Sequence, residues 1–174
     1  LHGSSAASDV YKRQASKLVI TYRLLAAEMT CRANHLDSTH VHIMPPYTWM
    51  LPTRGVEENR IDGQHIVKLI APKEWHTATQ LEGKEGSWVA NGRDEFLDAI
   101  MESNSNEMIT FDVMGTKQHL KLWDSGGLPI PEKGLNRLIE AMKLIIEEHF
   151  ALFGVPDWKD YWTVLHFTES GLSL

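Results

Sequence analysis

The sequence has almost no cysteine and no excess of basic residues. Its one cysteine, Cys31, excludes an internal disulfide and any CxxC redox or zinc motif. Lys and Arg number 17 against 23 Asp and Glu, a formal charge of −6. This acidic balance argues against the basic surface that nucleic-acid binding requires. The longest strongly apolar run, 144–146, is far too short to cross a bilayer. We therefore expect neither a nucleic-acid partner nor a membrane span.

Complete catalytic motifs are also missing. The chain has no GxSxG, HExxH, EF-hand loop or paired-carboxylate motif, and its glycines fit neither a P-loop nor a GxGxxG fingerprint. Cys31 would need a neighbouring base such as His35 to act as a nucleophile, and an inert cysteine is the more common case. The sequence therefore predicts no catalytic and no cofactor-binding residue.

The first residues have the character of a cloning or sequencing scar. Residues 4–14, SSAASDVYKRQ, match the translation of a transposase-based sequencing adapter over their whole length. Such segments are set aside before a fold is considered. We interpret 1–14 as a non-native, adapter-derived tail and expect one α+β domain over 15–174. On this interpretation the chain starts where a sequencing read began, so we expect a truncated native N-terminus.

Alternating apolar and polar residues predict a β-rich first part. The alternation covers 17–25, 39–44 and 64–71, and it recurs over 107–123 on either side of Gly115. A period of two is typical of half-buried strands, and a glycine between two such runs favours a hairpin. We therefore predict strands in the first three ranges and an antiparallel hairpin over 107–123.

Two segments have helical periodicity instead. Phe96, Leu97, Ile100 and Met101 are spaced as on one face of a helix, which predicts a short helix over about 93–102. Apolar residues then recur at intervals of three and four from Pro131 to Phe153, before Gly154. The sequence therefore predicts an α+β fold: an antiparallel β-rich body, this short helix and a long C-terminal amphipathic helix over about 131–153.

A histidine pair is the densest candidate for chemistry. His40 and His42 lie two residues apart in the predicted strand 39–44, so their side chains share a face. Two imidazoles on one face form half of a Zn²⁺ or Fe²⁺ site. A further ligand would have to come from a distant residue, for which the candidates are His65, His76, His119 and Glu28. The alternative interpretation is a polar, solvent-facing side of an amphipathic strand.

The C-terminal segment is rich in aromatic residues. Trp158, Tyr161 and Trp162 follow the predicted long helix, in a stretch too apolar to be loose. We expect this segment to pack back on the domain as a short helix or strand. Any of the three side chains left exposed would form a candidate surface for a protein partner, whose identity the sequence does not give.

The order of several features resembles a family of bacterial envelope proteins. A predicted strand ending at Cys31, a polar-alternating strand, an Asp-Gly turn at 62–63, Trp75, a hairpin and the helix-opening pair Gly134-Leu135 follow one another. This order resembles the invasion-associated locus B family and the related accessory lipoproteins of type VI secretion. The chain departs from the family after Phe150 and in having no second cysteine. The resemblance implies a periplasmic or secreted accessory protein without catalytic residues.

Three functional hypotheses follow. The leading one is a non-enzymatic binding or accessory domain, associated with the cell envelope. The second is a metal-dependent enzyme or metal-binding β domain that uses His40 and His42. The third is a viral or assembly protein that meets its partner through Trp158, Tyr161 and Trp162.

Overall fold

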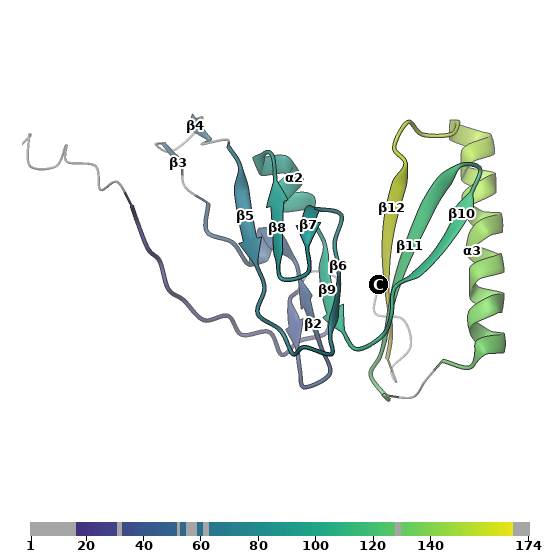
Figure 1. Cartoon of the computed structure of the whole chain (residues 1–174), viewed down its shortest axis with the longest axis horizontal. Coiled ribbons are helices and arrows are strands. Elements are labelled where there is room, and N and C mark those ends of the chain that lie inside the picture. Colours follow the sequence, from purple (N-terminus) through teal and green to yellow (C-terminus); the bar gives the residue numbers. More distant parts are fainter. Residues whose placement is uncertain are drawn as a thin grey trace, which may run out of the picture.

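The structure is a computed structural model that describes residues 17–30, 33–51, 53–54, 59–60, 63–127 and 130–168. Within these residues the chain folds into mostly antiparallel sheets and two α-helices (Figure 1). The predicted adapter-derived tail, 1–14, and Cys31 lie outside the described residues, so the interpretation of both remains a prediction.

The first part of the chain, called the β-body below, comprises residues 35–104. One sheet has the antiparallel order β1-β2-β9-β6, and a second has the order β7-β8-β5. The strands of the two sheets are β1 (His35–Leu36), β2 (His40–Ile43), β5 (His65–Lys68), β6 (His76–Ala78), β7 (Glu82–Lys84), β8 (Ser87–Ala90) and β9 (Met101–Asn104). The remaining elements are the 3-10 helix η1 (Pro45–Tyr47), the short pair β3 (Thr53–Arg54) and β4 (Asn59–Arg60), and α2 (Arg93–Asp98).

The second part, called the α/β layer, is one sheet covered by one helix. Its hairpin of β10 (Ile109–Val113) and β11 (Thr116–Asp124) is antiparallel, whereas β12 (Asp160–Phe167) pairs with β11 in parallel. The connection from β11 to β12 contains α3 (Glu132–Phe153), which lies along the sheet (Figure 1). The apolar stripe of α3 packs on Phe111, Leu120 and Leu122. This packing explains the three-and-four spacing of the helix, because one face of α3 is needed to bury the sheet.

Several sequence predictions are confirmed at this level. The fold is α+β, and the long helix covers 132–153 where 131–153 was predicted. The hairpin lies within 109–124, and β2 and β5 fall within the predicted strands 39–44 and 64–71. The aromatic C-terminal segment forms strand β12. The sheets are not antiparallel throughout, because β11 and β12 run in parallel.

The predicted helix over 93–102 is wrong in its second half. Helix α2 ends at Asp98, and residues 101–104 form β9, which pairs with both β2 and β6. All four residues of β9 are buried. The apolar residues of 96–101 are spaced as in a helix. The second half of the predicted helix is instead determined by strand pairing with residues about 25 and 60 positions away.

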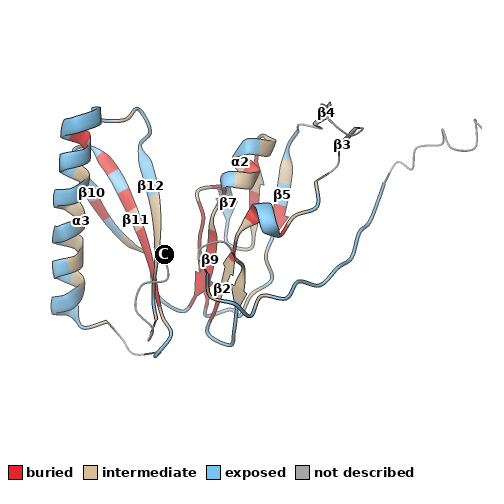
Figure 2. Ribbon diagram, turned by 180° about the vertical axis from the view of Figure 1, so that it is seen from behind, coloured by how far each residue is buried: buried red, intermediate tan, exposed pale blue. Residues whose placement is uncertain are grey.

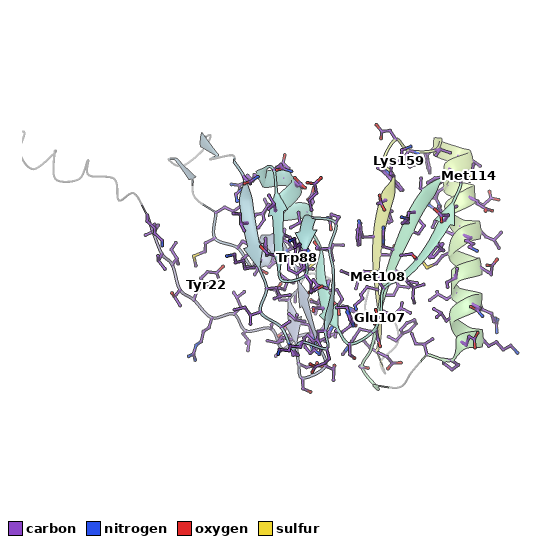
Figure 3. The ribbon with its side chains drawn as sticks, in the orientation of Figure 1. Tyr22, Trp88, Glu107, Met108, Met114 and Lys159 are labelled. Carbon is purple, nitrogen blue, oxygen red and sulfur yellow. The ribbon has the colours of Figure 1, made fainter. Side chains whose placement is uncertain are left out.

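The predicted strand over 17–25 is also absent from the structure. This segment is extended and mostly exposed, and it has no partner strand among the described residues. The side chain of Tyr22 in this segment (Figure 3) reaches the β-body. Its phenol oxygen donates a hydrogen bond to the carbonyl oxygen of Thr48, 2.6 Å away. Alternation alone therefore does not make a strand, because the ladder hydrogen bonds need a second chain segment.

The close approach of β8 to β7 leaves no room for a side chain at Gly83, which pairs with Trp88. An added Cβ would lie 2.4 Å from the carbonyl oxygen of Ser87 and 2.7 Å from Cα of Trp88, both backbone atoms. We expect Gly83→Ala to lower the free energy of unfolding by about 1–3 kcal/mol, because the hairpin has to shift. Urea unfolding followed by circular dichroism measures this.

The matched control for this substitution is Gly134→Ala in the first turn of α3. An added Cβ there meets nothing within 4 Å. Alanine favours a helix over glycine, so this variant should gain about 0.5–1 kcal/mol. Equal effects of the two substitutions would contradict the close approach at Gly83.

Candidate functional site

The buried polar residues gather where the β-body meets the α/β layer. Figure 2 shows burial along β9 and most of β11, and in both views β12 lies between β11 and the β-body. The polar side chains of Glu102 and Asn104 on β9 and of Lys121 on β11 are among the most buried in the chain. Buried polar groups require partners, so this contact is the place to look for a site.

Strand register explains how one face of β2 comes to lie opposite a carboxylate. His40 and His42 are alternate residues of β2, and their partners across the antiparallel ladder are Asn104 and Glu102 of β9. Residues directly opposite in such a ladder share a face. The parallel strand β12 then brings His166 next to Trp123 of β11 and toward the same carboxylate.

Three imidazoles and one amide surround the carboxylate of Glu102. We call His40, His42, Glu102 and His166 the His–Glu cluster. The Oε1 atom lies 2.9 Å from Nδ1 of His40 and 2.9 Å from Nδ2 of Asn104. The Oε2 atom lies 3.1 Å from Nδ1 of His42 and 3.0 Å from Nε2 of His166. Every partner is an N–H donor, so both carboxylate oxygens are satisfied.

These donors keep Glu102 ionised. Burial alone raises the pKa of this carboxyl, but the ring N–H groups of His166, His40 and His42 outweigh burial and hold its pKa far below the usual range. An ionised carboxylate only accepts hydrogen bonds, so the proton of each imidazole is assigned to the nitrogen that faces Glu102.

His40 is the most enclosed imidazole of the cluster. Its ring stacks on the indole of Trp123 at a centroid distance of 3.7 Å and an interplanar angle of 9°. Its second nitrogen, Nε2, lies 2.6 Å from Nδ1 of His35 in β1. Burial, followed by the neighbouring charge of His40, lowers the pKa of His35. His40 therefore has a hydrogen-bond partner on both ring nitrogens and an aromatic wall on one face.

Lys121 is a buried lysine whose charge interacts with that of Glu102. Its ammonium donates hydrogen bonds to the backbone carbonyls of Asn104 and Asn106. Burial lowers the pKa of Lys121 to about 8, although the negative charge of Glu102 opposes this shift. The lysine thus joins β11 to the segment that leaves β9, which Figure 3 shows at Glu107 and Met108.

The arrangement bears directly on the two interpretations of the histidine pair. A solvent-facing His40 is wrong, because this side chain is fully buried. Both histidines do reach one carboxylate, but the candidate third ligands lie elsewhere: His65 stacks on Phe96, His76 pairs with Glu107, His119 pairs with Asp160, and Glu28 is exposed. Among the described residues, two groups could hold a metal ion: His35–Asp37–His40 and His40–Glu102–His166.

Sequence reasoning missed Glu102 and His166 as members of the site. Glu102 lies at the end of the predicted helix over 93–102, and His166 lies in the C-terminal segment that we expected to pack back on the domain. Both are about 60 residues or more from β2, so only the pairing of β9 with β2 and of β12 with β11 brings them there. No local pattern around either residue signals that proximity.

The aromatic residues of the C-terminal segment are divided between surface and packing. Trp158 and Tyr161 are exposed, with ring centroids 5.1 Å apart. Trp162 stacks on His119 at 3.9 Å and 8°. The exposed pair begins near Lys159, at the start of β12 (Figure 3). A partner for this surface remains a prediction.

No helix among the described residues combines the length and the apolar character needed to cross a membrane.

Comparison with known proteins gives a family match and similar solved structures. Residues 8–101 match the peptidase M61 N-terminal domain. That match begins within the segment interpreted as adapter-derived. The structure is similar to the crystal structure of an aminopeptidase N family protein from Idiomarina loihiensis, with a TM-score of 0.65 and 19% identity over 83% of this chain. The chain spans only 28% of that protein. No curated protein matches the sequence.

These findings overturn two of the sequence-based hypotheses. The resemblance to the invasion-associated locus B family and to type VI secretion lipoproteins is wrong, because the matching family is that of a peptidase domain. The leading hypothesis of a non-enzymatic, envelope-associated accessory domain is wrong as well. The periplasmic or secreted location that the resemblance implied loses its basis. The resemblance rested on the order of strands and turns, which many unrelated β-rich chains share.

Proposed function

From the premise that the chain belongs to the peptidase M61 N-terminal domain family, we propose that it serves as the N-terminal domain of a peptidase. In this role it supports and orients a catalytic part that cleaves peptides. The observation that carries the proposal is the family match over residues 8–101, which includes the β-body up to the start of β9.

The extent of the fold match supports a separation between this chain and the catalytic part. The similar aminopeptidase N family structure is covered to 28% by this chain, so most of such a protein lies outside the matched part. The likeness at 19% identity concerns the fold alone. We place peptide cleavage in a part of the peptidase beyond these residues and assign to this chain the binding of that part.

The outer surface of α3 is suited to such an interface. Its sheet-facing side is used in packing, yet Leu144, Ile145 and Leu152 are exposed on the helix, and Phe153 is 82% exposed at its end. Contiguous exposed apolar residues mark an interaction surface. Trp158 contacts Phe150 at the C-terminal end of α3, with ring centroids 6.0 Å apart, and extends this surface to Tyr161. We propose that the catalytic part of the peptidase covers it.

The test uses the complete reading frame that encodes this chain. We expect the purified product to hydrolyse aminoacyl-p-nitroanilides or short peptides and to lose this activity when residues 17–168 are deleted. Leu152→Glu should lower kcat/KM at least about tenfold, because a buried carboxylate at the interface costs more than 1.4 kcal/mol.

The control on the same helix is Glu147→Gln, an exposed position about 140° around the helix from Leu152, which should leave kcat/KM unchanged. A product without peptidase activity, or one that keeps full activity after the deletion, would refute the proposed role. Equal effects of the two α3 substitutions would refute the interface while leaving the family role in place.

A further inference from the structure

We propose that the His–Glu cluster binds one divalent transition-metal ion, with Zn²⁺ as its natural occupant. The ligands are one imidazole nitrogen each from His40, His42 and His166, and one carboxylate oxygen of Glu102. The proposal rests on the cluster itself and not on the proposed peptidase role, and it concerns a site within this chain.

The donor set is the first argument. Three imidazoles and one carboxylate are ligands that Zn²⁺ commonly takes in a four-coordinate site. The candidate atoms of His40, Glu102 and His166 lie within 4.8 Å of one another. Nδ1 of His42 lies 3.1 Å from Oε2 of Glu102 but outside the group of three whose ligand atoms all lie within 4.8 Å, so it has to move inward to become the fourth ligand.

The spacing is the second argument. A tetrahedral zinc ion with ligand bonds near 2.1 Å holds its ligand atoms about 3.4 Å apart. The nitrogen-to-oxygen distances around Glu102 are 2.9, 3.0 and 3.1 Å. These distances are short of the coordinated spacing by a few tenths of an ångström, whereas His42 has to move further, because its ring lies outside the group whose ligand atoms are all within 4.8 Å.

Proton placement is the third argument. A metal ion takes the lone pair of the ring nitrogen that now carries a proton toward Glu102, so that proton has to move to the other nitrogen of the same ring. For His40 the receiving atom is Nε2, and Nδ1 of His35 lies 2.6 Å away as its acceptor. Metal-bound histidines usually donate their second N–H in this way, which fixes the ring.

The surroundings complete the site. The amide of Asn104 donates to Oε1 of Glu102 at 2.9 Å and holds the carboxylate, while Trp123 packs on the ring of His40. Four protein ligands leave no open position, which is the character of a structural zinc site. Because His40, His42 and Glu102 belong to the β-body and His166 to β12, the ion joins the β-body to the α/β layer.

The experiment titrates ZnCl₂ and CoCl₂ into the EDTA-treated 174-residue chain. Calorimetry should give one site per chain, and Co²⁺ should show the intense visible absorption of tetrahedral coordination. Bound Zn²⁺ should raise the melting temperature. His42→Ala and His166→Ala should each weaken binding more than about 100-fold, since losing even an outer partner costs 10–100-fold. His35→Ala removes the outer partner of His40 and should weaken binding by about 10–100-fold.

The control is His76→Ala combined with His119→Ala, which removes two imidazoles from surface pairs and should leave the affinity unchanged. If the ligand variants fail to fold, X-ray absorption of the Co²⁺-loaded chain counts the imidazole ligands directly. Absence of a one-to-one site, equal loss in the control variant, or six-coordinate oxygen ligation would overturn the proposal. None of these measurements uses peptidase activity, so the two proposals fail separately.

Discussion

Glu102→Ala is expected to lower the free energy of unfolding by about 3–5 kcal/mol in the absence of metal, the range found when one partner of a buried charged pair is removed. The carboxylate accepts hydrogen bonds from His40, His42, His166 and Asn104. Its removal leaves these N–H groups facing a cavity in a region where Glu102 and His40 are fully buried. Each unsatisfied buried donor costs about 1–3 kcal/mol, although relaxation recovers part of this.

Chemical unfolding in EDTA, followed by circular dichroism, measures this effect. The control is Glu107→Ala, whose carboxylate is 82% exposed and pairs only with His76 among the contacts described. It should change stability by less than about 1 kcal/mol. Glu102→Gln should fall between the two, because it keeps one acceptor but turns an NH₂ group toward the imidazoles. A Glu102→Ala variant as stable as the Glu107→Ala control would contradict the hydrogen-bonded cluster.

Trp123→Ala should cost a similar amount, about 3–5 kcal/mol, for a different reason. The indole is buried, stacks on His40 at 3.7 Å and donates a hydrogen bond from Nε1 to Oγ1 of Thr39 at 2.9 Å. Truncation opens a cavity between β11 and β2 and removes the wall that holds the ring of His40. The loss should therefore appear in stability and, for the zinc site, in affinity.

Two variants separate the contributions of this tryptophan. Trp123→Phe keeps the aromatic stack and loses the hydrogen bond, so we expect a loss of about 1 kcal/mol. Trp158→Ala removes an indole that is 39% exposed and should cost less than Trp123→Ala. Thermal unfolding of the variants measures which substitution costs more stability. If Trp158→Ala proves the more damaging, the contact between the β-body and the α/β layer is not the main support of this region.

The elements that could be predicted from the sequence are those that local pattern determines. The hairpin of β10 and β11 has alternation on both sides of a glycine turn, and α3 has an unbroken apolar stripe over 22 residues. Residues 96–101 fitted a helix equally well on local grounds, but α2 ends at Asp98 and Met101 begins β9. The extended segment 17–25 shows the converse, since alternation without a partner strand produced no sheet.

The candidate site was predictable only in its first half. His40 and His42 stand out because both lie in one short strand, where alternation places them on one face. Glu102 and His166 follow from strand pairings across about 60 residues (His42 with Glu102) and 43 residues (Trp123 with His166), which no local periodicity encodes. The buried role of Lys121 was likewise hidden, since a lysine in an alternating strand is ordinarily assigned to solvent.

The parallel pairing of β11 with β12 sets the order in which the His–Glu cluster can be assembled. Parallel neighbours need a crossover, and here the crossover is the 22-residue α3. During synthesis the β-body and the hairpin are therefore complete before His166 exists. Until β12 docks, Glu102 has only two of its three imidazole donors, and one edge of β11 lacks its parallel strand. Closure of the cluster is thus a late step, because it requires that α3 and β12 have both packed onto the sheet.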